Sequence, residues 1–320
     1  MSDLQYHVDG SLTPASKATV SVRDRGFMYG DAAFETLRAY GGVPFEWEAH
    51  DQRLRETART LGFEDAVPRR EDLRERVEET LAANDLRDAY VRLSVTRGVQ
   101  PGKLTPQEAV DPTVVVIVST LPRGGVDGER VWDGPATLHL AETRRVPDEA
   151  IPASAKTHNY LNGILARLEG RDGTLGEGAG NASTDSDDPN EDTGGPDETL
   201  LRTLDGTLTE GATSNLFFVD DGVLHTPTTD LPVLPGITRR TVLELASECA
   251  IPVEAGRYDW ANLQRATEVF VTNSTWEIRP VDTIVRGGSE GGATRVTYEP
   301  GPVTEQLQQA FDERVEALYD

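Results

Sequence analysis

Residues 34–40 alternate in character, as a β-strand does when its two faces meet different surroundings. Phe34, Thr36 and Arg38 fall on one face, and the residues between them fall on the other. An arginine and a threonine beside an aromatic ring are suited to lining a pocket for an acid. A solvated sheet face produces the same alternation, so this stretch alone leaves both interpretations open.

A second strand is expected at 89–98, where Tyr90, Arg92 and Ser94 share one face. Residues 112–119 form a continuous apolar run, which is typical of a strand buried on both sides. Apolar residues at helical spacing then predict helical segments, at residues 50–62, 70–84, 164–168, 237–250 and 303–318.

Composition along the chain predicts two domains. Residues 1–121 form the expected N-terminal domain, and the glycine-containing residues 122–133 are the expected linker. Residues 134–320 form the expected second domain. Within it, residues 172–197 are rich in Gly, Ser, Thr, Asp and Asn and almost free of apolar side chains, which predicts a disordered acidic insert.

The 320-residue chain is strongly acidic, with 31 Lys and Arg against 55 Asp and Glu and a formal net charge of -24. This charge argues against nucleic acid and against an anionic membrane as partners. The frequent use of arginine in place of lysine favours a halophilic protein over a generic acidic one. No apolar run approaches the ~20 residues of a membrane span, and the first residues lack the regions of a signal peptide. We therefore expect a cytoplasmic protein.

Several common catalytic motifs are missing from the sequence. It has no Gly-x-Ser-x-Gly, no phosphate-binding loop ending in Gly-Lys-Ser or Gly-Lys-Thr, and no dinucleotide fingerprint. The five histidines lack the spacing of metal ligands, and a single cysteine, Cys249, excludes an internal disulfide framework. No metal site is expected.

Lys156 stands just before a helical run in a chain that has few lysines. A lysine amine can form a Schiff base with a carbonyl, including that of pyridoxal phosphate, although a solvated surface charge is the more common role. Further along, Pro235 and Gly236 precede an amphipathic run. They mark a helix N-terminus whose free backbone N–H groups are able to hold phosphate.

An ordered set of motifs resembles the class IV aminotransferase family, the fold-type IV enzymes that use pyridoxal phosphate. The motifs are Lys156, Arg53 early in a helix, Glu-Gly-Ala-Thr-Ser-Asn at 210–215, Pro-Gly-Ile-Thr-Arg at 235–239 and Thr-Asn-Ser at 272–274. The resemblance runs from about His7 to Val315, interrupted by the acidic insert. It implies an α+β fold of two domains, with a smaller N-terminal α+β domain and a larger C-terminal pseudo-barrel α/β domain.

The resemblance also implies the cofactor, pyridoxal 5'-phosphate, and the residues that hold it. Lys156 matches the Schiff-base lysine, which also shuttles the substrate's proton. Glu210 matches the acid beside the pyridine nitrogen, which keeps that nitrogen protonated. Arg53 matches the arginine that binds the phosphate. The remaining cofactor positions are Ile237, Thr238 and Ser274 for the phosphate, and Asn159 or Tyr160 for the ring oxygen.

The family contains 4-amino-4-deoxychorismate lyases, branched-chain aminotransferases and D-amino-acid aminotransferases, so the reaction depends on the substrate pocket. Thr36 and Asn273 match polar residues of the lyases, which are suited to handling a proton during pyruvate elimination. The short spacing from Lys156 to Asn159 also resembles the lyases. We therefore expect a lyase of the folate pathway that releases 4-aminobenzoate.

Other features point to the aminotransferases. Branched-chain aminotransferases, which use 2-oxoglutarate and glutamate, resemble the chain at four positions, Phe34, Arg38, Tyr90 and Arg92. They are the alternative to the lyase. Gly102 stands where the lyases carry an arginine, and Gly102 and Leu104 replace the arginine and histidine of D-amino-acid aminotransferases. The D-specific reaction is therefore disfavoured.

The resemblance implies a homodimer that acts on a small amino acid or amino-substituted acid. A loop starting at Arg97, residues 97–100, would complete the partner's active site and meet the substrate. A non-catalytic or cofactor-free relative is the remaining alternative, and the presence of Lys156, Glu210 and Arg53 together argues against it.

Overall fold

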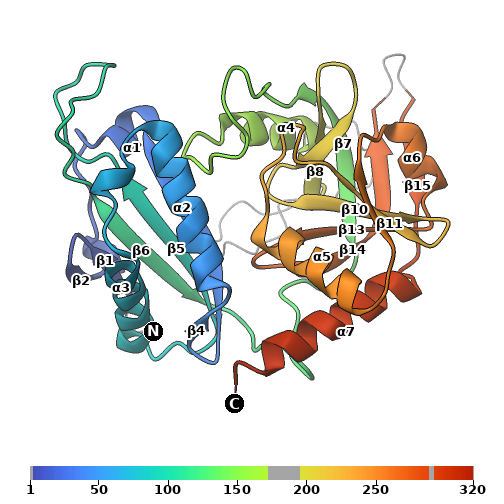
Figure 1. Ribbon diagram of the computed structural model, residues 1–320, viewed down its shortest axis with the longest axis horizontal. Helices are drawn as coiled ribbons and strands as arrows, with labels where there is room; N and C mark the ends of the chain where they lie inside the picture. Colours follow the sequence, from blue (N-terminus) through green and yellow to red (C-terminus); the bar gives the residue numbers. More distant parts are fainter. Residues whose placement is uncertain (1–2, 172–194, 288–291, 320) are drawn as a thin grey trace. The chain divides into compact units, whose positions relative to one another are not determined.

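The computed structural model describes residues 3–171, 195–287 and 292–319 (Figure 1). The expected acidic insert, 172–197, lies outside these residues except for its last three. One of those three, Asp197, accepts a hydrogen bond from the backbone N–H of Thr137 at 2.8 Å.

The chain divides into two compact units. The first unit contains Met1–Val131, Ser154–Asn159 and Gln309–Asp320, and the second contains Trp132–Ala153 and Tyr160–Gln308. Two segments from the C-terminal part of the chain therefore belong to the first unit. One of them carries Lys156, so the candidate Schiff-base lysine is built into the N-terminal unit.

The first unit contains one antiparallel sheet and its covering helices. Its strands are β1 (Gln5–Val8), β2 (Ser11–Pro14), β3 (Ala32–Tyr40), β4 (Val43–Pro44), β5 (Ala89–Thr96) and β6 (Val114–Thr120). They pair in the order β2-β1-β6-β5-β3-β4. Its helices are α1 (Arg25–Tyr29), α2 (Trp47–Leu61) and α3 (Arg70–Ala83), with short 3-10 turns η1 (Ala15–Lys17) and η2 (Glu64–Ala66).

Helices α2 and α3 supply one side of an apolar core, and the sheet supplies the other. Leu37 of β3 and Leu93 of β5 join this core with Leu54 of α2 and Val77 of α3, and all four are fully or almost fully buried. Burial of each such side chain contributes about 1.5–3 kcal/mol. The odd-numbered residues of β3 and β5 therefore face the helices, and the even-numbered residues face the opposite side.

The strands predicted from alternation are confirmed as β3 and β5, which lie side by side. Their antiparallel register pairs the residues predicted to share a face, Phe34 with Ser94, Thr36 with Arg92 and Arg38 with Tyr90. The two predicted faces thus join into one continuous sheet face, which we call the Phe34 face. It lies opposite the face covered by α2 and α3.

The second unit contains a nine-stranded mixed sheet. Its strands are β7 (Ala136–Arg144), β8 (Glu198–Arg202), β9 (Leu208–Gly211), β10 (Asn215–Asp220), β11 (Val223–Pro227), β12 (Val253–Gly256), β13 (Glu268–Asn273), β14 (Glu277–Arg286) and β15 (Thr294–Thr297). Eight of them follow the order β12-β11-β10-β13-β14-β7-β8-β9, and β15 pairs with β14. The end strand β9 also contacts β10 and β11, so the sheet curls on itself.

The remaining helices are α4 (Leu161–Arg171), α5 (Ile237–Glu248), α6 (Trp260–Arg265) and α7 (Pro302–Glu316). Ala166 of α4 packs against Ala141 of β7 and Leu201 of β8. The inner face of the curled sheet holds a second apolar core, with Phe218 of β10 and Val271 of β13 among its members. No helix in the described ranges is long and apolar enough to cross a membrane.

A tight turn, in which Gly211 N–H donates to the Ser214 carbonyl, separates β9 from β10. The short elements α6, β12 and β15 were not expected. The six-residue helix α6 forms because Asp259 and Asn262 cap it reciprocally.

Candidate active site

The Lys156 segment is held against the edge of β3. Phe34 N–H donates to the Lys156 carbonyl at 3.0 Å, and His158 N–H donates to the Ala32 carbonyl at 3.2 Å. The Lys156 N–H donates instead to Thr57 Oγ1 on α2, at 3.0 Å. Both backbone groups of the candidate lysine are therefore fixed by residues more than ninety positions earlier in the chain.

Three basic side chains gather around the ring of Phe34. Lys156 Nζ lies 4.5 Å from the ring centroid, and the Arg92 guanidinium carbon lies 3.9 Å from it. The His158 ring meets Phe34 edge-on, with 5.5 Å between centroids. Cations over an aromatic face are attracted by its quadrupole. The lysine amine therefore lies on the Phe34 face, together with three predicted substrate or catalytic positions, Phe34, Thr36 and Arg92.

His158 was not among the residues predicted for the site. Its Nε2 lies 3.1 Å from Ser94 Oγ. Burial lowers the pKa of His158 to about 4, and the charge of Arg92 acts in the same direction. The imidazole is therefore neutral near pH 7. Thr157, between the two, forms an antiparallel bridge with Ala33, so Lys156 and His158 on either side of it point the same way. The sequence shows the spacing of two residues but not the bridge.

Arg38 is on the Phe34 face but at the far end of β3 from Lys156. The side chain is 2% exposed, and its Nη2 donates to the Pro122 carbonyl at 2.7 Å. The guanidinium also lies over the Tyr40 ring, 4.7 Å from the centroid. The partner of Arg38 on β5, Tyr90, is half-buried.

Arg53, the candidate phosphate arginine, belongs to a buried ionic cluster. Its Nε and Nη2 donate to the two carboxylate oxygens of Glu35, at 2.9 and 2.6 Å. His50 Nδ1 lies 2.7 Å from the same carboxylate. Burial alone would raise the pKa of Glu35, but the charge and hydrogen bonds of Arg53, together with the bond from His50, lower it to about 2. Burial also lowers the pKa of His50.

The candidate loop residue Arg97 makes its observed contacts inside the first unit. It is 5% exposed, and its Nε donates to Asp31 at 2.8 Å. Its Nη2 donates to the Leu61 carbonyl, and its guanidinium lies over the Phe63 ring. These contacts anchor the start of the 97–100 loop.

In the second unit, Glu210 lies in a ring of polar partners. Arg145 Nη2 lies 2.9 Å from Glu210 Oε1, and Leu234 N–H donates to Oε2 at 2.9 Å. The Asn215 amide donates to Oε2 at 3.3 Å. Arg145 was not predicted, because its pairing with Glu210 joins residues far apart in the sequence. Asn215 ends the Glu-Gly-Ala-Thr-Ser-Asn motif, so the sequence did contain a signal for it.

Helix α5 begins at the predicted phosphate position, with Ile237 and Thr238 in its first turn. Its N-cap residue, Gly236, makes no side-chain capping bond. A Cβ at Gly236 would lie 1.9 Å from Asn215 Oδ1, so a larger residue there would displace the Asn215 side chain. Uncapped N-terminal amides on a close-packed backbone suit a phosphate. The donor set therefore fits pyridoxal phosphate in this unit, with Glu210 supplying the acid.

The turn between β13 and β14 contains Asn273 and Ser274, both half-buried. Asn273 Oδ1 accepts the backbone N–H groups of Thr275 and Trp276, at 3.0 and 2.7 Å. Asn273 therefore shapes this turn. Of the two candidates for the ring oxygen, Asn159 is exposed in the first unit, and Tyr160 is half-buried in the second, just before α4.

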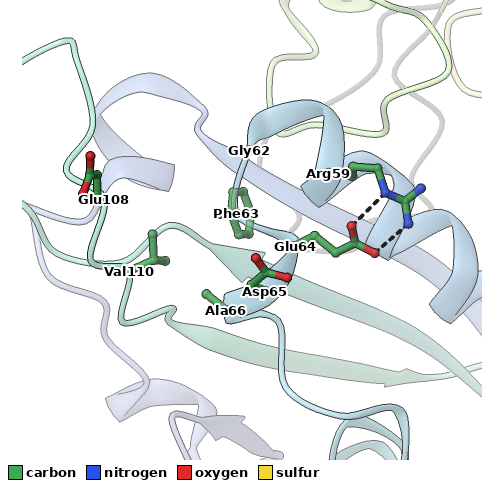
Figure 2. A pocket seen from close by; sticks show the side chains of 8 residues that line it. All are labelled: Arg59, Gly62, Phe63, Glu64, Asp65, Ala66, Glu108 and Val110. Carbon is green, nitrogen blue, oxygen red and sulfur yellow. Dashed lines mark hydrogen bonds and ion pairs between the residues drawn. The ribbon is translucent and has the colours of Figure 1, made fainter.

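A cavity of about 490 Å³ lies elsewhere in the first unit and contains none of the predicted site residues (Figure 2). Its lining includes Phe63, Val110 and three acidic side chains. Arg59 donates to both carboxylate oxygens of Glu64, at 2.7 and 2.6 Å. In the described part of the chain, no group of His, Cys, Asp and Glu is arranged to hold a metal ion.

Comparisons with known proteins agree with this arrangement. The family model for amino-transferase class IV matches residues 32–174 and 192–284. The chain is 33% identical to a putative branched-chain-amino-acid aminotransferase from Methanocaldococcus jannaschii, over 96% of this chain and 95% of that protein. It is 32% identical to aminodeoxychorismate lyase from Bacillus subtilis, over 89% of each.

A solved structure extends the likeness to the fold. The branched-chain aminotransferase of Thermoproteus uzoniensis, determined with norvaline, superposes with a TM-score of 0.81. It is 26% identical and covers 98% of this chain and 95% of that one. A second solved branched-chain aminotransferase, 27% identical, was determined with pyridoxamine 5'-phosphate. The chain therefore belongs to the class IV aminotransferase family and, like its members, is a pyridoxal-phosphate-dependent enzyme with the two-part fold that the sequence predicted.

Proposed function

We propose that the protein is a 4-amino-4-deoxychorismate lyase, which releases pyruvate from its substrate and leaves 4-aminobenzoate. The observation that carries the proposal is the position of Thr36 on the Phe34 face, two residues from Phe34 and opposite Arg92. Successive same-face residues of a strand lie about 7 Å apart. The Thr36 hydroxyl is therefore close enough to Phe34 to meet a substrate held near Lys156.

When bound, pyridoxal phosphate supplies an electron-withdrawing ring that stabilises negative charge on the substrate. Lys156 holds the cofactor and moves a proton to and from the substrate with its amine. The Glu210 carboxylate would accept a hydrogen bond from the protonated pyridine nitrogen and so keep that nitrogen charged. In the first unit, Arg53 is the proposed phosphate arginine. In the second unit, the first-turn residues of α5, Ile237 and Thr238, would hold the phosphate together with Ser274.

The elimination needs a proton donor for the departing enolpyruvyl carbon, and Thr36 is the proposed donor in the first unit. Arg92 supplies a positive charge for a substrate carboxylate beside it. Asn273 has a smaller part in this proposal than the sequence predicted, because its side-chain oxygen is bonded to the turn. Its amide group remains the proposed polar contact in the second unit.

The second candidate is a branched-chain aminotransferase, and the likeness to the Methanocaldococcus jannaschii protein favours it. In that reaction Tyr90, Arg38 and Arg92 would recognise the substrate and the acceptor's second carboxylate. Arg38 lies near the end of β3 away from Lys156, which bonds to Phe34 near the start of the strand, and its Nη2 donates to the Pro122 carbonyl.

Two parallel assays separate the candidates. The loaded enzyme is incubated with aminodeoxychorismate, with pyruvate and 4-aminobenzoate as readouts, and separately with leucine and 2-oxoglutarate. The proposal expects rapid pyruvate release and leucine turnover at least a hundredfold slower. Thr36→Val should lower pyruvate release by roughly ten- to a hundredfold, the usual contribution of a positioned proton donor, while the cofactor absorbance survives. Efficient leucine turnover with no pyruvate release would establish the aminotransferase instead.

We also propose that the protein is a homodimer and that it works in a cytoplasm of high salt. The support for the dimer is an apolar surface formed by α1 and the neighbouring loop, with Phe27 70% and Leu104 78% exposed. Arg25 of α1 holds the loop against the helix by donating hydrogen bonds to the carbonyls of Lys103 and Leu104. Exposed apolar patches mark association surfaces. Light scattering should give twice the chain mass, and Phe27→Asp should lower it.

A further inference from the structure

Helix α2 carries a row of three buried polar side chains in the first unit. His50, Arg53 and Thr57 are spaced three and four residues apart, so they share one face of the helix. Their exposed fractions are 2%, 6% and 1%. Each makes a hydrogen bond to a residue outside the helix. We call these three residues the α2 row.

Two members of the α2 row fasten the helix to β3. His50 and Arg53 both bond to the carboxylate of Glu35, which is fully buried. Glu35 is the neighbour of Phe34 on β3, and the two side chains point to opposite faces of the sheet. Helix α2 is therefore attached to β3 at Glu35, the residue next to Phe34, whose ring Lys156 approaches.

The third member, Thr57, bonds to the lysine segment. Its hydroxyl oxygen accepts the Lys156 N–H at 3.0 Å, while the Lys156 carbonyl accepts the Phe34 N–H at 3.0 Å. Lys156 is thus held by α2 on its N–H side and by β3 on its carbonyl side. The buried hydroxyl has little access to water, so solvent cannot easily replace it as the acceptor.

We propose that Thr57 is a positioning residue for Lys156. Its hydroxyl fixes the backbone from which the lysine side chain extends, and so places Nζ over the ring of Phe34. Thr57 acts through Lys156 and is not itself a catalytic residue. The inference rests on the proposed role of Lys156 in holding the cofactor.

Thr57→Val is the direct test, because valine keeps the shape of threonine and removes the acceptor. Thr57→Ser restores a hydroxyl at the same position. Thr60→Val is a matched control on the same helix. The Thr60 hydroxyl is exposed, and it donates to the Glu56 carbonyl of α2 itself. Each variant is measured as the loaded enzyme.

The first readout is amide hydrogen exchange at Lys156, which does not depend on activity. Thr57→Val should speed this exchange by about tenfold or more, because the amide loses its acceptor. The second readout is turnover. A displaced amine should lower kcat by roughly ten- to a hundredfold with little change in KM. Thr57→Ser should recover most of both losses, and Thr60→Val should behave as wild type.

The inference is overturned if Thr57→Val exchanges and turns over like the wild type, or if Thr57→Ser is as impaired as Thr57→Val. If the valine variant does not fold, Thr57→Ala takes its place in the comparison with serine. Lys156→Ala separates this inference from the proposed role of the lysine. If borohydride still fixes the cofactor to Lys156→Ala, the proposed role of the lysine is disproved. If Lys156→Ala loses the fixed cofactor while Thr57→Val behaves as wild type, only the positioning by Thr57 is disproved.

Discussion

Replacing Glu35 by glutamine should destabilise the first unit severely, although the two side chains have the same shape. The Glu35 carboxylate accepts from Arg53 Nε through one oxygen and from Arg53 Nη2 and His50 through the other. In Glu35→Gln one of these oxygens becomes an NH2 group. Whichever way the amide is turned, a donor then faces a donor, and the buried guanidinium loses its counter-charge.

Two independent arguments give the size of the effect. Removing one partner of a buried ion pair typically costs about 3–5 kcal/mol. The pKa of Glu35 falls from 4.5 to about 2 on folding, a difference that corresponds to about 3 kcal/mol of stability near pH 7. We therefore expect Glu35→Gln to lower the free energy of unfolding by about 3 kcal/mol at pH 7.

The pH dependence of this loss has a defined sign. Because the pKa of Glu35 is lower in the folded protein than in the unfolded chain, its contribution is fully present above pH 4.5. The contribution disappears as the pH falls from about 4.5 towards 2, since the unfolded chain then binds a proton that the folded protein does not. The difference between the wild type and Glu35→Gln should shrink by about 1.4 kcal/mol for each pH unit below 4.5.

Urea denaturation at constant salt, at pH 7 and at about pH 3.5, measures both quantities. Asp72→Asn is the matched control, because Asp72 accepts from Arg69 through two oxygens in the same way, at 3.1 and 2.7 Å, but on the surface. Exposed pairs contribute little to stability, so this variant should unfold like the wild type. A loss below about 1 kcal/mol in Glu35→Gln, or one that does not shrink in acid, would refute the reasoning.

Four further outcomes are expected. Proton NMR should give a titration midpoint for His158 near 4, because burial and Arg92 lower its pKa, and a midpoint near 6.5 would contradict the site geometry. Glu210→Gln should slow turnover by roughly a hundredfold and weaken cofactor binding far less, since an amide cannot compensate a pyridinium; equal losses would count against the role. Gly236→Ala should weaken cofactor binding by roughly tenfold or more in a fluorescence titration, because its Cβ would meet Asn215, whereas Gly134→Ala, with open space around it, should not. The free energy of unfolding should rise with KCl concentration, as screening relieves the repulsion within a chain of net charge -24, and a fall would contradict the halophilic interpretation.

Periodicity predicted the Phe34 face correctly because the direction of a side chain on a strand is a local property. Alternation assigned Thr36 and Arg92 to the right faces of two strands, although it could not show that they lie opposite each other. The pairing required the antiparallel register of β3 with β5. The same limit explains His158: its spacing of two residues from Lys156 is visible in the sequence, but its contact with Phe34 is not.

The sequence by itself determined the family, the order of the motifs and the faces of the main strands and helices. These features depend on residue type and on spacing within short stretches of chain. Only the tertiary structure decided the partners of the charged groups, such as Glu35 for Arg53 and Arg145 for Glu210. It also placed the Lys156 segment in the first unit. Such contacts join residues far apart in the chain, and packing of the whole unit sets them, because no local pattern records which distant group will satisfy a buried charge or a free N–H.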